Sequence, residues 1–133
     1  MDLTSTPIAE PLQGPYRPPG DKSISHRLAI LTGLATGHST IRGFLDSEDT
    51  VNTARAMQSM GVGMDWARGE NGWTLSIQGG RLHPPSEALD FGNSGTGCRL
   101  MTGVLSAMGG QAGFADTPIG LVGDHSLSRR PMG

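Results

Sequence analysis

The 133-residue chain has little of several residue types that decide a protein's class. Cys98 is its only cysteine, which excludes an internal disulfide framework and suits a reducing compartment, so we expect a cytoplasmic protein. The net charge is −2, and Lys22 is the only lysine among ten basic residues, so no basic surface for nucleic acid is expected. No apolar run approaches the ~20 residues that cross a bilayer, which excludes a membrane span.

Metal-ligand spacing is also missing. The single cysteine has no partner cysteine, and the histidines show no pattern typical of a metal site; they are His26, His38, His83 and His125. We therefore expect no metal. Aromatic residues make up only 5%, so the core must be built from aliphatic side chains and methionine. Glycine and proline are abundant instead, with 21 and 9 residues, and they divide the chain into short segments.

Two of these segments carry apolar residues at helical spacing. The expected boundaries are Asp21 or Ser23 to Gly37 for the first helix, and Asp46 or Ser47 to Gly61 for the second. The expected buried face is Ile24, Leu28, Leu31 and Ala35 in the first helix, and Val51, Ala54 and Met57 in the second. Strand-like sequence lies between the helices, over residues 38–45.

Residues 62–66 and 73–78 predict a hairpin turned at 69–72, with Trp66 and Trp73 packing across it. A short strand is expected over 88–91, followed by a third helix with its buried face at Cys98, Met101, Leu105 and Met108. The sequence also suggests a strand over 113–115 and an extended loop over 119–133. This alternation of helices and strands predicts an α/β fold.

Three segments could carry chemistry, and the first surrounds Lys22. A cation in the first turn of a helix opposes the helix dipole, so the position of the only lysine needs another explanation. Ser23 and Arg27 lie four residues apart beside it, and together with the free N–H groups of a helix start they indicate a phosphate site. The alternative is a capped helix with two solvated cations.

The second segment is the glycine-rich run 92–97 at the start of the third helix, where the backbone at Gly95 can approach a ligand closely. Its spacing fits neither the phosphate-binding loop of nucleotide hydrolases nor the dinucleotide fingerprint, and a simple turn is the alternative.

The third segment is 123–133, where Arg130 precedes a proline and could hold a carboxylate or phosphate; a solvated arginine pair is the alternative.

Three strings follow one another along the chain: Pro-Gly-Asp-Lys-Ser-Ile-Ser-His-Arg at 19–27, Leu-Asp-Phe-Gly-Asn-Ser-Gly-Thr-Gly-Cys-Arg-Leu at 89–100, and Gly-Asp-His-Ser-Leu-Ser-Arg-Arg-Pro-Met-Gly at 123–133. Taken together and in this order, they resemble the family of 5-enolpyruvylshikimate-3-phosphate synthases (3-phosphoshikimate 1-carboxyvinyltransferases), and they look like its second, bacterial class. The resemblance implies part of one lobe of a two-lobed enolpyruvyl transferase fold built from β-α-β-α-β-β units. It also implies transfer of the enolpyruvyl group of phosphoenolpyruvate to the 5-hydroxyl of shikimate 3-phosphate, releasing phosphate without metal or cofactor.

By the same resemblance, Lys22 contacts both substrates and assists proton transfer, and Ser23 and Arg27 hold shikimate 3-phosphate. Gly95 offers its backbone to phosphoenolpyruvate, and Arg130 holds the charged groups of that substrate. The herbicide glyphosate occupies the phosphoenolpyruvate site in this family, so Gly95 is also expected to affect its binding.

Members of the family are considerably longer than this chain. We therefore expect an N-terminal piece that is inactive alone, with residues 1–20 as an arm that belongs with the other lobe and 21–133 as an incomplete N-terminal lobe. The expected partners are the two substrates and the remaining C-terminal polypeptide as a separate chain. Two alternatives stay open: a non-catalytic phosphate-binding fragment, and the sister enolpyruvyl transferase acting on UDP-N-acetylglucosamine.

Overall fold

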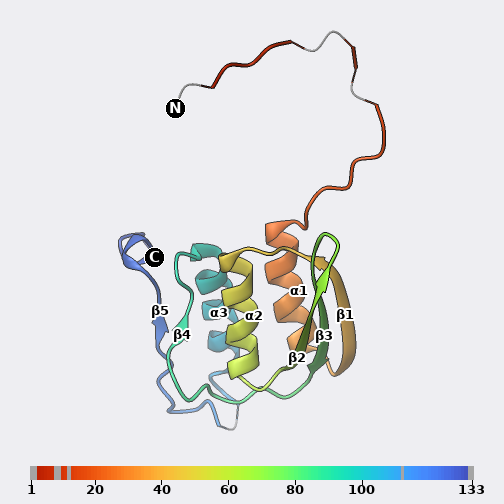
Figure 1. The fold of residues 1–133 in the computed structure, drawn as a ribbon. Coiled ribbons are helices and arrows are strands. Elements are labelled where there is room, and N and C mark those ends of the chain that lie inside the picture. Colours follow the sequence, from red (N-terminus) through yellow and green to blue (C-terminus); the bar gives the residue numbers. More distant parts are fainter. Residues whose placement is uncertain (1–2, 8–9, 12, 112, 132–133) are drawn as a thin grey trace.

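The computed structural model describes residues 3–7, 10–11, 13–111 and 113–131. Within them, three long helices lie between two sheets, so that the body has three layers (Figure 1). The elements in chain order are α1 (Lys22–Leu34), β1 (Gly37–Phe44), α2 (Glu48–Ser59), β2 (Gly63–Gly69), β3 (Gly72–Gly79), β4 (Leu89–Asp90), α3 (Gly95–Met108), β5 (Leu121–Val122) and α4 (His125–Ser128). This arrangement confirms the predicted α/β class.

The larger sheet has the strand order β1-β3-β2, and all of its pairings are antiparallel. The predicted hairpin is confirmed: Gly69 pairs with Gly72, whose φ of +119° suits glycine best. Trp66 is paired with Leu75, so Trp73 lies diagonally across from Trp66 on the same face, and the two rings meet edge to face at 5.8 Å. The predicted tryptophan packing is therefore confirmed as a diagonal pair.

The smaller sheet consists of β4 and β5, which pair in parallel and are connected by α3. Parallel strands need a crossover of this kind because a tight turn can join only antiparallel neighbours. The predicted strand over 113–115 is wrong, since these residues form a turn. The prediction of an extended loop over 119–133 is also wrong, because this segment contains the short strand β5 and the short helix α4. Residues 132–133 of the segment lie outside the described residues.

The helices α1 and α2 begin at predicted caps, whereas no cap was predicted for α3. Asp21 accepts a hydrogen bond from the Ile24 N–H at 2.7 Å, which settles the choice between Asp21 and Ser23. Ser47 caps α2 in the same way, and Ser94 caps α3. The α1 helix ends at Leu34, earlier than predicted.

The buried face of α1 differs from the predicted one. Ile24 and Leu31 are 58% and 61% exposed, and the buried residues are instead Ser25, His26, Ala29, Ile30 and Gly33. The reason is close packing of small residues: a Cβ added at Gly33 would lie 3.0 Å from Val62 Cγ2, and one added at Gly79 would overlap backbone oxygens of α1. The face is selected by how closely the backbones approach rather than by its content of large apolar side chains.

The core lies between the helices and the larger sheet and continues toward the smaller one. Its largest fully buried apolar side chains are Phe44, Met57, Met60, Leu75, Ile77, Phe91 and Met101. The predicted inward positions Ala54 and Met57 of α2 and Met101 of α3 are confirmed. In the part of the chain that the structure describes, no helix combines the length and apolar character needed to cross a membrane.

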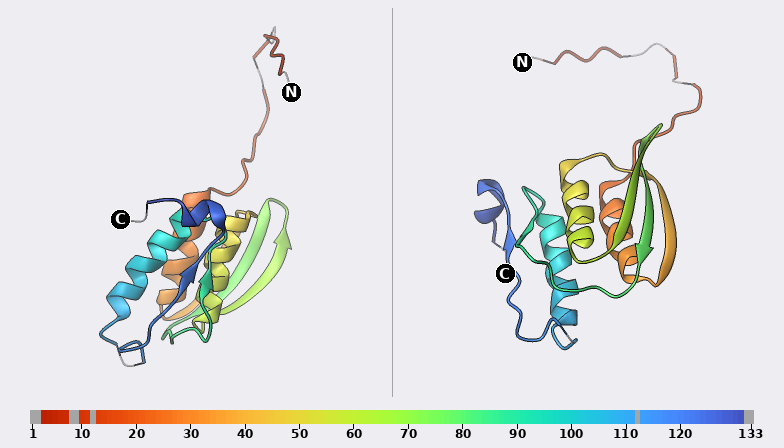
Figure 2. Two further views of the ribbon diagram at one scale, coloured as in Figure 1. Left: turned by 90° about the vertical axis from the view of Figure 1, so that its left-hand side faces the viewer. Right: turned by 60° about the horizontal axis from the view of Figure 1, so that its bottom comes forward.

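Residues 13–20 form neither helix nor strand and lead away from the body at the start of α1 (Figure 2). Arg17 makes an ion pair at 3.4 Å with Glu70, and both side chains are exposed. Gly20 lies so close to the backbone of Gly43 that a Cβ would overlap its carbonyl oxygen. The assignment of residues 1–20 to another lobe stays a prediction.

Candidate functional site

The N-terminal ends of α1, α2 and α3 lie at the same end of the helix layer (Figure 1). Lys22, at the start of α1, forms an ion pair with Asp49 in the first turn of α2. On the other side of α2, a Cβ added at Gly92 would lie 2.9 Å from Asn52 Nδ2, which places the loop before α3 against α2. Because each helix start carries partial positive charge, this end of the molecule favours anions.

Lys22 is half-exposed, with a side-chain exposure of 50% against 20% for Asp49. The Asp49 carboxylate offsets the unfavourable interaction of the ammonium with the dipole of α1. It therefore gives a reason, besides a bound ligand, for a lysine at this position. The sequence analysis did not predict this pairing, because it joins two separate helices.

Ser23 and Arg27 lie on one exposed face of α1, as predicted. Arg27 Nη1 donates to the Ser23 carbonyl at 3.0 Å, one turn back along the helix. The rest of the guanidinium has no hydrogen bond to the described residues and remains available to an anion at the start of α1.

Gly95 and Arg130 come together although they are distant in sequence. Arg130 Nη2 donates to Asn93 Oδ1 at 2.7 Å and to Ser126 Oγ at 3.2 Å, so the guanidinium is fixed over the glycine-rich loop. A Cβ added at Gly95 would lie 3.3 Å from Arg130 Nη1. The structure therefore joins the second and third predicted segments into one local site, with the Asn93 side chain as an unpredicted anchor.

A second guanidinium, that of Arg99, lies beside this pair. Arg99 Nη2 donates to the Pro131 carbonyl at 3.0 Å, and a Cβ added at Gly95 would lie 3.0 Å from Arg99 Nη1. Among the described residues, neither Arg99 nor Arg130 has a carboxylate within ion-pair distance. Two neighbouring cations held by neutral acceptors repel each other, so a bound anion stabilises them. Arg99 could have been predicted as a site residue from its position in the first helical turn after the glycine-rich loop.

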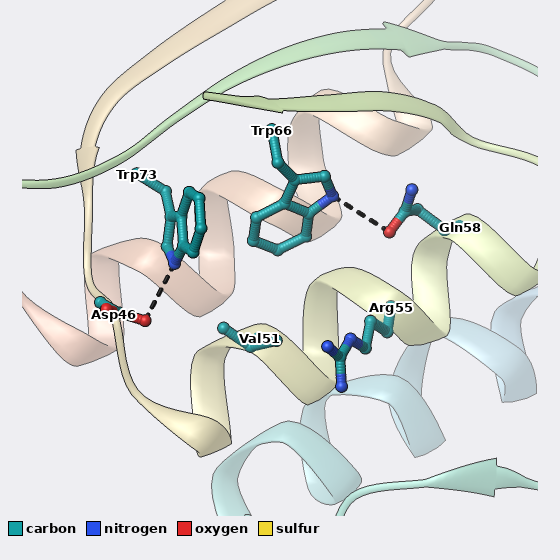
Figure 3. A pocket seen from close by; sticks show the side chains of 6 residues that line it. All are labelled: Asp46, Val51, Arg55, Gln58, Trp66 and Trp73. Atoms are coloured by element: carbon teal, nitrogen blue, oxygen red, sulfur yellow. Dashed lines mark hydrogen bonds between the residues drawn. The ribbon is translucent and has the colours of Figure 1, made fainter. Parts of the chain in front are cut away.

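A groove of about 320 Å³ lies away from these residues, between the β2–β3 hairpin and α2 (Figure 3). Trp66 Nε1 donates to Gln58 Oε1 at 3.2 Å and Trp73 Nε1 donates to Asp46 Oδ1 at 2.9 Å, so both indoles are anchored. The hydrogen bond from Arg68, followed by that from Trp73, lowers the pKa of Asp46 below its ordinary value. The groove contains none of the predicted site residues.

Across the described ranges, no three His, Cys, Asp or Glu side chains gather in a way that could hold a metal ion. That the chemistry uses no metal stays a prediction.

Comparison with known proteins places these observations in one family. Residues 7–133 match the family described as EPSP synthase (3-phosphoshikimate 1-carboxyvinyltransferase). The 3-phosphoshikimate 1-carboxyvinyltransferase of Rhodopseudomonas palustris (strain BisA53) is 48% identical over 122 residues, which cover 91% of this chain and 26% of that protein. The protein of the same name from Rhodospirillum rubrum is 47% identical over 126 residues, or 92% of this chain and 26% of that protein.

A solved structure of EPSP synthase from Acinetobacter baumannii is similar in fold, with a TM-score of 0.75 and 40% identity, covering 90% of this chain and 25% of that chain. The similarity confirms the predicted two-lobed enolpyruvyl transferase fold as the one to which these elements belong. This chain spans about a quarter of the length of the relatives it matches. The chain belongs to the EPSP synthase family.

Proposed function

We propose that this chain supplies part of the active site for transfer of the enolpyruvyl group of phosphoenolpyruvate to the 5-hydroxyl of shikimate 3-phosphate, with release of phosphate. The observation that carries the proposal is the pair of guanidiniums, Arg99 and Arg130, fixed beside Gly95 at the start of α3 without a carboxylate partner among the described residues. Both substrates carry phosphate, and phosphoenolpyruvate also carries a carboxylate. Family membership supplies the class of reaction.

The proposed roles follow the two groups of residues. Ser23 and Arg27 hold the phosphate of shikimate 3-phosphate at the start of α1, while Gly95 and Arg130 receive phosphoenolpyruvate at the start of α3. Lys22 lies on the α2 side of α1 and contacts both substrates; its ion pair with Asp49 shows that its ammonium reaches toward α2. In this scheme the 5-hydroxyl loses its proton as its oxygen adds to C2 of phosphoenolpyruvate, and C3 gains a proton. Elimination then breaks the bond between C2 and the phosphate oxygen while C3 loses a proton, so the net reaction releases phosphate together with the proton of the hydroxyl.

The chain alone is proposed to be inactive, because it spans only about a quarter of its relatives. The test measures phosphate release from the two substrates by the 133-residue chain, with and without a second polypeptide that supplies the remaining length of a close relative. We expect release only from the combination, and Lys22→Ala in the combination should abolish it. Turnover by the chain alone would contradict the proposed inactivity, and no turnover by the combination would contradict the proposed function.

A second candidate is a non-catalytic module that binds phosphate compounds. The free part of the Arg27 guanidinium at the start of α1 favours it, since binding there needs no second lobe. NMR titration of the chain with shikimate 3-phosphate tests this candidate: the shifts should disappear in Lys22→Ala and Arg27→Ala. UDP-N-acetylglucosamine in a parallel titration tests the sister transferase, and shifts with this ligand alone would favour that activity.

The remaining proposals concern organisation and location. We propose that residues 1–20 form an arm that packs with the other lobe of the complete protein, residues 21–133 forming part of the N-terminal lobe. The exposure of residues 13–19 supports this assignment. We also propose a cytoplasmic location, for which the free thiol of Cys98 is the supporting observation. Cell fractionation tests the location.

A further inference from the structure

The α2 helix lies between the two groups of anion-binding residues. Asp49 and Thr53 face α1, where they contact Lys22 and His26. Glu48 and Asn52 face the other way, toward the glycine loop before α3. Contacts on both sides of the first two turns of α2 therefore fix the distance between the Lys22 side and the Gly95 side of the site.

His26 is fully buried on the α2 side of α1, one turn after Lys22. Its Nδ1 lies 2.8 Å from Thr53 Oγ1, and its Nε2 is buried without a hydrogen-bond partner among the described residues. Thr53 Oγ1 in turn lies 3.3 Å from the Asp49 carbonyl. Both donors are satisfied if the His26 Nδ1–H donates to Thr53 Oγ1 and the Thr53 hydroxyl donates to the Asp49 carbonyl. The lone pair of His26 Nε2 is then the only polar site of the ring without a partner.

In this arrangement the imidazole is neutral. A protonated ring would bury a second N–H without an acceptor, which is unfavourable. Burial lowers the pKa of His26, and the cations Lys22 and Arg27 lower it further, while the Asp49 carboxylate acts in the opposite direction. The hydrogen bond between α1 and α2 is therefore an uncharged one in a low-dielectric setting.

Thr53 also contacts the first turn of α3. A Cβ added at Gly97 would overlap Thr53 Oγ1 and would lie 2.9 Å from Ser94 Oγ, the oxygen that caps α3 by accepting from the Gly97 N–H at 3.1 Å. The Thr53 hydroxyl thus touches all three helices: it belongs to α2, hydrogen-bonds to α1 and packs against the backbone of α3.

We propose that His26 and Thr53 are positioning residues whose hydrogen bond holds the Lys22 end of α1 at a fixed distance from the Gly95 end of α3. The proposal rests on the proposed function for its consequence in substrate binding. Neither residue touches substrate in this scheme. Their role is to keep the two groups of anion-binding residues in the arrangement that one pair of substrates can bridge.

The test compares NMR spectra of the 133-residue chain with two disrupting variants, Thr53→Val and His26→Leu, and two conservative variants, Thr53→Ser and His26→Asn. Serine keeps the hydroxyl, and asparagine can place a polar atom near Nδ1. The disrupting variants should shift the Lys22 amide and also the Gly95 and Gly97 amides, while the conservative variants restore the wild-type positions. The ¹⁵N shifts of His26 should show a protonated Nδ1 and a bare Nε2.

The matched control is Thr50→Val. Thr50 is also fully buried in α2, but the hydrogen bonds of its hydroxyl go to the Leu45 and Ser47 carbonyls and not to α1. It should leave the amides of Gly95 and Gly97 in place. If Thr50→Val shifts them as much as Thr53→Val does, or if Thr53→Val leaves them unmoved, the positioning role is overturned.

Titration with phosphoenolpyruvate in the presence of saturating shikimate 3-phosphate adds the functional readout, because only this pair of ligands spans both groups of anion-binding residues. If the disrupting variants reduce the competent arrangement to about a tenth of the population, the apparent dissociation constant rises about tenfold. If the wild-type chain does not bind phosphoenolpyruvate, the proposed binding role of the chain fails while the amide shifts still decide the positioning role. Should His26→Leu not fold, the comparison of Thr53→Val with Thr53→Ser decides it alone.

Discussion

Two glycines of α3 provide a sharp test of the three-helix junction. Gly97 lies in the first turn, where an added Cβ would overlap Thr53 Oγ1 and would lie 3.2 Å from Phe91 Cδ1. Gly103 lies in the middle of the same helix with nothing within 4 Å of an added Cβ. The substitution of alanine therefore has the same chemistry at both positions but very different surroundings.

The expected magnitudes follow from this difference. Alanine at Gly103 should raise the free energy of unfolding by about 0.5–1 kcal/mol, because glycine loses more backbone freedom on folding than alanine does. Alanine at Gly97 gains at most the same amount but overfills a packed region, which costs about 1–3 kcal/mol. We expect Gly97→Ala to be about 1–3 kcal/mol less stable than Gly103→Ala.

The assay is urea unfolding of the chain, followed by the fluorescence of Trp66 and Trp73. The double variant Gly97→Ala with Thr53→Ala removes the overlapped oxygen, so it should recover part of the loss, seen as a coupling energy between the two positions. If Gly97→Ala proves as stable as Gly103→Ala, the close contact of Thr53 with α3 does not exist, and the positioning argument fails with it.

Three further predictions address other features. In α1, Ile30→Ala should cost about 2–5 kcal/mol while Leu31→Ala changes stability by about 0.5 kcal/mol; equal losses in urea unfolding would contradict the buried face described above. Burial lowers the pKa of His26 in the folded chain below its ordinary 6.5, so the unfolded chain binds more protons than the folded chain as the pH decreases below about 6.5. The free energy of unfolding should therefore fall in this pH range, and in His26→Asn the urea midpoint should depend less on pH there. In the reconstituted enzyme, Gly95→Ala places a methyl 3.3 Å from Arg130 Nη1 and should weaken glyphosate more than phosphoenolpyruvate, whereas equal losses of both would refute the steric reasoning.

Local signals predicted local structure well. Asp21 and Ser47 cap their helices because a short side-chain oxygen can reach a free N–H three residues on, and both positions can be found by that pattern. The turn at Gly72 needs a positive φ, and the Asn-Gly sequence there predicts such a turn. These features depend on neighbours within a few residues, so the sequence contains what determines them.

Features that depend on distant neighbours were missed. The α1 face was predicted from large side chains such as Leu31, but close approach at Gly33 selected a different face. The ion pair of Lys22 with Asp49 joins two helices whose relative placement no spacing reveals. Arg99 is part of the candidate site because the fold places Arg130 beside it at Gly95, and the sequence does not reveal that contact. In each case the determining contact crosses between elements, and periodicity along one element does not report it.

The anchoring of Arg130 on Asn93 has a consequence for the order in which the molecule assembles. The two residues are 37 positions apart, and the chain between them contains α3 and β5, which pairs with β4. Closing a long connection of this kind is slow compared with forming a hairpin such as β2–β3. During synthesis from the N-terminus, we therefore expect the Lys22 side to be in place before Arg130 has been added, so the nascent chain presents its two anion-binding groups one after the other.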